Sequence, residues 1–250
     1  MKIILSPAKK MNVDLETLEP ITIPTFIKDT EDILNWLKEK SFDELKSLWG
    51  CNDKLARENY ERIQNMNLYE RLTPAVLSYE GLAYQYMAPA VFEEQYEYIQ
   101  EHLCILSAFY GIIKPMDGVT PYRLEMQAKA SINGCENMYQ FWGDKLYREV
   151  RDESGIIINL ASKEYSKCIE KYLKPEDQYI TINFCEESKG KLVTRGTYAK
   201  MARGEMVKYM AENRIESPTD IQGFEGLGYQ FRRDLSSAKE YVFERKFRMN

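Results

Sequence analysis

The fold is decided by the stretch Ile156-Ile157-Ile158-Asn159-Leu160-Ala161-Ser162. Its apolar residues predict a strand buried on both faces, as in a parallel sheet. Such a strand carries Asn159 and Ser162 to its carboxyl end, where open α/β sheets bind their ligands. We therefore consider Asn159 and Ser162 candidate pocket residues. The alternative is that they only cap a helix beginning near Lys163.

Two polar segments precede this strand in otherwise apolar and aromatic surroundings. The segment 121–126 contains Arg123 and Glu125, and the segment 139–144 ends at Asp144. A carboxylate beside a binding site can transfer protons, so Glu125 and Asp144 are the candidates for a catalytic role. The alternative is that Arg123 and Glu125 form a structural ion pair.

A second short buried strand is predicted at the start of the chain, from Lys2 to Leu5. It ends at Ser6-Pro7, because the residue before a proline disfavours helix. Lys9 and Lys10 then lie just past a strand end, where lysines can bind a phosphate or carboxylate group. A solvated pair of lysines is the alternative.

The rest of the chain mixes helical and strand patterns. Helical periodicity covers 30–67, 164–172 and 197–213, and alternation predicts strands at 179–184, 191–194 and 240–247. The segment 103–109 either continues a helix that begins near Phe92 or forms a buried strand.

One helical corner has the spacing of a DNA-binding motif. Residues 45–56 follow the helix-hairpin-helix pattern, with Gly50 at the first glycine position and Asn52 at the second. Asparagine tolerates a left-handed backbone better than most residues, so the turn is feasible. Such a hairpin directs backbone N–H groups at a phosphate, with Lys54 and Arg57 beside it. The alternative is an ordinary helical corner in which Gly50 is the C-cap.

The charge distribution is uneven. The net charge of −5 disfavours nucleic acid as a partner, but residues 191–250 carry 12 Lys and Arg against 8 Asp and Glu. On the predicted helix 197–213, Lys200 and Arg203 are three residues apart and share a face. A basic C-terminal part fits phosphate binding as well as a solvated surface.

Composition excludes several kinds of protein. The five cysteines are widely spaced without a CxxC pair, which argues against a disulfide framework and a structural zinc site. The one histidine, His102, excludes a multi-histidine metal site, and we expect neither metal nor cofactor. No signal segment is present, and no apolar run approaches the roughly 20 residues of a membrane span. We expect a cytoplasmic protein with no membrane partner.

Six separated motifs occur in order along nearly the whole chain: Ser6-Pro7-Ala8-Lys9, Pro121-Tyr122-Arg123-Leu124-Glu125-Met126, Tyr139-Gln140-Phe141-Trp142-Gly143-Asp144, Asn159-Leu160-Ala161-Ser162, Tyr198-Ala199-Lys200-Met201-Ala202-Arg203-Gly204 and Glu212-Asn213-Arg214. Together they resemble the YaaA family of bacterial peroxide-stress proteins. The resemblance implies protection against hydrogen peroxide, with lowered free iron, less oxidative DNA damage and DNA binding. It also implies an α/β (mixed α+β) fold: one compact domain over 1–250, with a mixed sheet surrounded by helices, a positively charged cleft and a helix-hairpin-helix segment at about 30–68.

Two functions of different class follow. The first is DNA binding without sequence specificity, through phosphates held by the hairpin and by a cleft lined by Lys9, Lys10, Arg123, Lys200 and Arg203. The second is an enzyme for a small anionic or nucleotide-like substrate, in which the same cations without Lys10 hold the anion and Glu125 or Asp144 transfers a proton. A deep pocket around both carboxylates favours the enzyme, whereas an open groove continuous with residues 50–57 favours DNA binding.

Overall fold

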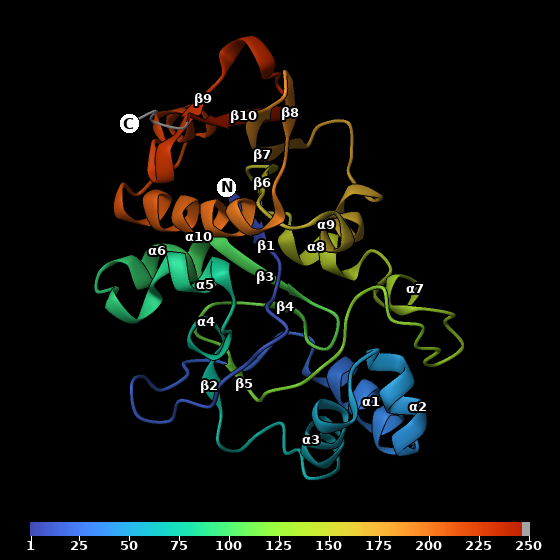
Figure 1. The fold of residues 1–250 in the computed structure, drawn as a ribbon. Helices are drawn as coiled ribbons and strands as arrows, with labels where there is room; N and C mark the ends of the chain where they lie inside the picture. Colours follow the sequence, from blue (N-terminus) through green and yellow to red (C-terminus); the bar gives the residue numbers. More distant parts are fainter. Residues whose placement is uncertain (247–250) are drawn as a thin grey trace.

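The computed structural model describes residues 1–246 apart from the side chain of Val91. One mixed sheet lies at its centre (Figure 1). The strand order is β4-β3-β1-β6-β7-β10-β9, and β8 pairs with β7. The strands are β1 (Lys2–Leu5), β3 (Leu103–Ser107), β4 (Gly111–Ile113), β6 (Ile156–Asn159), β7 (Gln178–Ser188), β8 (Lys191–Val193), β9 (Tyr229–Phe231) and β10 (Glu240–Arg245). A separate two-stranded sheet pairs β2 (Thr73–Pro74) with β5 (Gly118–Val119).

The centre of the large sheet is parallel. β1 pairs in parallel with β3 on one side and β6 on the other, and the parallel run continues through β7 to β10. Ile4 of β1 lies opposite Asn159 of β6. The carboxyl ends of these two strands therefore lie together, as their apolar sequences predict.

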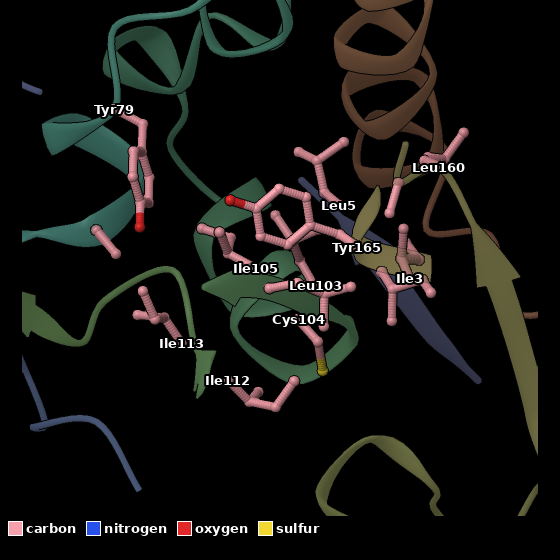
Figure 2. Close-up of a cluster of buried hydrophobic side chains, with 14 of the residues drawn as sticks. Ile3, Leu5, Tyr79, Leu103, Cys104, Ile105, Ile112, Ile113, Leu160 and Tyr165 are labelled. Atoms are coloured by element: carbon pink, nitrogen blue, oxygen red, sulfur yellow. The ribbon is translucent and has the colours of Figure 1, made fainter. Parts of the chain in front are cut away.

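The core covers both faces of the central strands. Ile3, Ile4 and Leu5 are each at most 1% exposed, so successive residues of β1 are buried on opposite faces of the sheet. Figure 2 shows Ile3 and Leu5 beside Leu103 and other buried side chains. Full burial of each such side chain stabilises the fold by roughly 1.5–3 kcal/mol, which fixes these strands at the centre.

Helices surround the sheet, which confirms the mixed α/β class. The α-helices are α1 (Ile27–Lys38), α2 (Phe42–Trp49), α3 (Asp53–Gln64), α4 (Ala75–Ser78), α5 (Leu82–Met87), α6 (Gln95–His102), α7 (Met138–Trp142), α8 (Lys145–Val150), α9 (Lys163–Glu170) and α10 (Gly196–Glu212). Short 3₁₀ turns cover Pro89–Val91, Pro218–Gly223, Gly226–Gly228 and Arg233–Leu235. The helix α10 packs against α5 and α6, while α1, α2 and α3 form one end of the molecule (Figure 1). Within residues 1–246, every helix is too short or too polar to cross a membrane.

Several local expectations can be compared with these elements. The helix α6 ends at His102 and β3 begins at Leu103, so the buried-strand alternative for this segment is confirmed. His102 is itself buried, with Nδ1 2.8 Å from the carbonyl oxygen of Met1. The strand β10 ends at Arg245, and Phe247, the expected last residue, lies outside the described residues.

Candidate anion-binding site

The carboxyl ends of β1 and β6 are tied together by hydrogen bonds. The backbone N–H of Leu160 donates to the carbonyl of Ile4 over 2.9 Å, and that of Ser162 donates to Ser6 Oγ over 2.8 Å. Ser6 Oγ in turn donates to Ser162 Oγ over 3.2 Å. Ser162 occupies the N-cap position of α9, but its hydroxyl bonds to Ser6 rather than capping its own helix. The loops after the two strands therefore form one hydrogen-bonded wall.

Asn159 supports this wall from its buried side. Its side chain is buried, with Oδ1 accepting the Ala161 N–H over 2.9 Å and Nδ2 donating to Thr181 Oγ1 over 3.3 Å. The structure therefore places Asn159 behind the site, where it fixes the turn after β6, and places Ser162 in the wall itself.

A cavity of about 400 Å³, which we name the inner cavity, opens at these strand ends. The positively charged residues in its wall are Lys9, Lys10, Arg123, Lys200 and Arg203. They come from the loop after β1, the loop after β5 and the helix α10. The structure thus brings together the five cations that were expected to line a cleft, although they lie up to 194 residues apart in the chain.

The position of α10 depends on one glycine. A Cβ at Gly204 would lie 1.8 Å from the carbonyl oxygen of Ala83 in α5 and 2.6 Å from its carbonyl carbon. Only a residue without a side chain allows the two helix backbones to approach so closely. This packing holds the face of α10 that bears Lys200 and Arg203 against the strand ends.

Two of the lysines have carboxylate partners. Lys9 Nζ lies 2.7 Å from Glu125 Oε1, and Arg123 Nη2 lies 3.8 Å from the same oxygen. Lys10 Nζ lies 2.6 Å from Glu80 Oε2. The Lys9 side chain is 66% exposed, so its ion pair contributes little to stability. Glu125 therefore lies in the cavity wall, as a site residue would, and neutralises part of its positive charge.

The two arginines are left with unsatisfied donors. The Arg123 side chain is only 13% exposed, and the Nε atoms of Arg123 and Arg203 are both buried without a hydrogen-bond partner in residues 1–246. No carboxylate of this described part lies within 4.0 Å of the Arg203 guanidinium nitrogens, and burial lowers the pKa of Arg203. A buried N–H without an acceptor is costly, so these two arginines favour the binding of an anion beside them.

Glu164 is a site residue that the sequence analysis missed. It lies in the first turn of α9, two residues after Ser162, and lines the inner cavity. Its Oε1 accepts the Gln127 N–H over 3.3 Å. Burial, with the nearby charge of Glu125 in addition, raises the pKa of Glu164. Its proximity in sequence to the strand end was the signal that could have identified it.

The inner cavity adjoins a second space of about 1050 Å³, which we name the outer hollow. Lys9, Arg123 and Glu125 line both spaces. From there the outer hollow extends along α1 and α2 to Gly50. The arrangement therefore combines a pocket at Glu125 with a groove that reaches the helical hairpin.

Asp144 lies elsewhere. Its carboxylate pairs with Arg148, one turn along α8, and it lines neither the inner cavity nor the outer hollow. The expected pocket around both Glu125 and Asp144 is thus built around Glu125 alone.

The hairpin between α2 and α3 differs from the expected turn. Gly50 has the expected left-handed backbone, with φ 54° and ψ 44°. The expectation for Asn52 was wrong, because its backbone is extended at φ −71° and ψ 164°. Asn52 is instead the N-cap of α3, and its Oδ1 accepts the Leu55 N–H over 3.0 Å. This side chain already satisfies one of the amides that the motif would offer to a phosphate.

The hairpin cations lie outside both spaces. Lys54 is exposed, and the Arg57 guanidinium lies over the Phe42 ring at 5.3 Å from its centroid. Asp53, the first residue of α3, pairs with Lys46 and puts a carboxylate where a phosphate would approach. Lys54 and Arg57 thus lie apart from the five cations of the inner cavity.

The fold and the site define a mixed α/β protein whose parallel strands end at a basic cavity. Residues 1–235 match the family model described as peroxide stress protein YaaA, and the chain belongs to this family. Its relatives include a UPF0246 protein of Agathobacter rectalis, 68% identical over 247 residues that cover 98% of this chain and 99% of the relative. UPF0246 proteins of Lachnoclostridium phytofermentans and Ligilactobacillus salivarius are 52% and 51% identical over 97% of this chain, covering 96% and 99% of their own lengths. Membership of the family supports a role in peroxide stress.

Proposed function

We propose that the protein serves the peroxide stress response by binding a small anion, through a phosphate or carboxylate group, in the inner cavity. The observation that carries this proposal is that Arg123 and Arg203 lie in the wall of one cavity and each has a buried Nε donor with no hydrogen-bond partner among residues 1–246. Charge-assisted hydrogen bonds from guanidinium groups to an anion are about twice as strong as neutral ones. An anion held there would satisfy both arginines and neutralise Lys200.

The anion is a substrate in the enzymatic form of this proposal. Glu125 is then the residue that transfers a proton, because it lines the cavity and Asp144 does not. Its contact with Lys9 keeps the carboxylate in place beside the bound anion.

Tungstate, a heavy-atom analogue of phosphate, tests where an anion binds. Crystals soaked in tungstate are expected to give an anomalous peak with its oxygens about 3 Å from the guanidinium nitrogens of Arg123 and Arg203. Crystals of Arg203→Met are the control and are expected to lose this peak. Peaks found only outside the inner cavity would contradict the proposal.

We propose DNA binding without sequence specificity as a second function. The outer hollow supports it, because this groove continues from Lys9 and Arg123 past Lys40 and Lys129 to Gly50. These four cations outnumber the three carboxylates of the same lining, Asp43, Glu44 and Glu125. Phosphates of a strand along this groove would meet these cations, and the exposed Lys54 and Arg57 of the hairpin would bind flanking phosphates. Such contacts position a duplex without reading its bases.

A salt titration of duplex DNA binding tests this second function. The logarithm of the affinity should fall with the logarithm of salt concentration by about 0.9 for each neutralised phosphate, whatever the DNA sequence. The double variant Lys54→Ala, Arg57→Ala is expected to weaken all duplexes alike and flatten the slope by about two units at most.

The matched control removes the same charge from the exposed tip between β7 and β8. The double variant Lys189→Ala, Lys191→Ala should leave the slope unchanged, since neither lysine lines the groove. Equal slopes in the wild type and the hairpin variant would remove the hairpin from the DNA contact.

A further inference from the structure

The inner cavity holds acceptors as well as donors. Glu164 lines the same wall as Arg123 and Arg203, and no Lys or Arg nitrogen lies within 4.0 Å of its carboxylate in residues 1–246. Its carboxylate accepts the backbone N–H of Gln127 over 3.3 Å, and the backbone of Met126 also hydrogen-bonds to it. A carboxylate repels a simple anion, so its place in an anion site indicates a ligand that also carries hydrogen-bond donors.

The third feature is an apolar part of the wall. Leu82, Leu124, Leu160 and Tyr165 contribute to the lining beside the charged groups. Small-molecule sites commonly combine such apolar walls with a few polar groups that fix orientation, in spaces of about 300–1,000 Å³. At about 400 Å³ the inner cavity is far larger than a phosphate ion needs.

We propose that the ligand of the inner cavity is a nucleoside monophosphate. Its phosphate binds Arg123, Arg203 and Lys200, its sugar hydroxyl or base amino donors bind Glu164, and its uncharged faces contact Leu82 and Leu124. The proposal rests on the anion binding proposed above and names the class of molecule that bears the anion. A nucleoside monophosphate supplies an anion, several donors and a planar apolar surface in one molecule, so it satisfies all three features of the wall.

Calorimetric titrations of the full-length protein with a graded set of ligands test this inference. The set consists of inorganic phosphate, ribose 5-phosphate, adenosine and the four ribonucleoside 5′-monophosphates. At least one monophosphate is expected to bind about tenfold or more tighter than phosphate, ribose 5-phosphate and adenosine, because only it engages cations, Glu164 and the apolar wall together.

Glu164→Gln separates the recognition of donors from the recognition of phosphate. It keeps the shape of the side chain and removes its charge, so the monophosphate should lose about tenfold in affinity while inorganic phosphate does not weaken. Glu170→Gln is the matched control, because it makes the same change on the exposed side of α9, outside the inner cavity. It should change neither affinity.

The outcomes distinguish this inference from the function on which it rests. Phosphate binding without any tighter binding of a monophosphate would overturn the inference and leave the anion site standing. Ribose 5-phosphate binding as tightly as the best monophosphate would also overturn it, because the base would then contribute nothing. If none of the phosphate compounds binds, both the nucleoside monophosphate inference and the proposed anion-binding function are overturned.

Discussion

Gly204→Ala is expected to destabilise the protein by about 3 kcal/mol or more, at the upper end of what overpacking costs. The added Cβ would lie 1.8 Å from the carbonyl oxygen of Ala83 and 2.9 Å from its Cα, and both belong to backbone that cannot rotate away. Relief requires α10 to move off α5, which would also carry Lys200 and Arg203 out of the inner cavity. Urea unfolding measures the loss as a lower midpoint at an unchanged slope.

The same substitution elsewhere in α10 is the control. Gly196→Ala, at the first residue of α10, places a Cβ with no heavy atom of residues 1–246 within 4 Å, so helix propensity alone should act and raise stability by less than the roughly 1 kcal/mol of a helix interior. Opposite effects of one chemical change in one helix would show that the contact with Ala83 decides the outcome. Equal midpoints for the two variants would contradict the close approach of α10 and α5.

Arg203→Met is expected to raise the stability of the free protein by about 1 kcal/mol or more. Arg203 is a partly buried cation whose Nε is buried without a hydrogen-bond partner in residues 1–246, which is costly, and an apolar side chain of similar length removes that cost. Methionine and arginine have similar helix propensities, so the helix itself should be unaffected. Thermal unfolding without added anions should show a higher Tm for the variant.

Lys208→Met controls for the general effect of methionine on α10. Lys208 lies 3.8 Å from Glu212 on the same helix and takes no part in the inner cavity, so its replacement should change stability by no more than about 0.5 kcal/mol. A loss of stability in Arg203→Met would mean that the guanidinium is satisfied within the protein and is not kept for a ligand.

The parts of the fold that could be predicted are those whose cause is local. The apolar runs of β1 and β6 are typical of strands buried on both faces of a sheet, as both strands are. This local pattern is enough to predict the two strands and the carboxyl ends at which the site lies. The N-terminus of α2 also has a local cause, because Ser41 and Glu44 are three residues apart and form a capping box, with the Ser41 N–H donating to Glu44 Oε2 over 2.8 Å. The convergence of Lys9 and Arg203 followed from strand-end reasoning together with a family resemblance.

The features that could not be predicted have one of two causes. Some depend on contacts between residues far apart in the chain, and one depends on which of two local backbone conformations a residue adopts. The approach of Gly204 to Ala83 spans more than a hundred residues, and a glycine inside a helical pattern does not show what it faces. In the sequence, Glu164 is an ordinary acidic residue in the first turn of a predicted helix. Only the folded structure shows that the loop bearing Gln127 lies against it. Asn52 could have adopted a left-handed turn, but capping Leu55 stabilises the extended backbone instead.

The central claim, that the inner cavity binds anions through Arg123 and Arg203, is tested most directly by titrating inorganic phosphate into the wild type and into Arg203→Met by calorimetry. Hydrogen bonds from a charged group contribute about 1.5–3 kcal/mol each, so the variant should bind phosphate at least about tenfold more weakly than the wild type, while being the more stable protein. Equal phosphate affinity in the two proteins, or no binding by either, would contradict the claim.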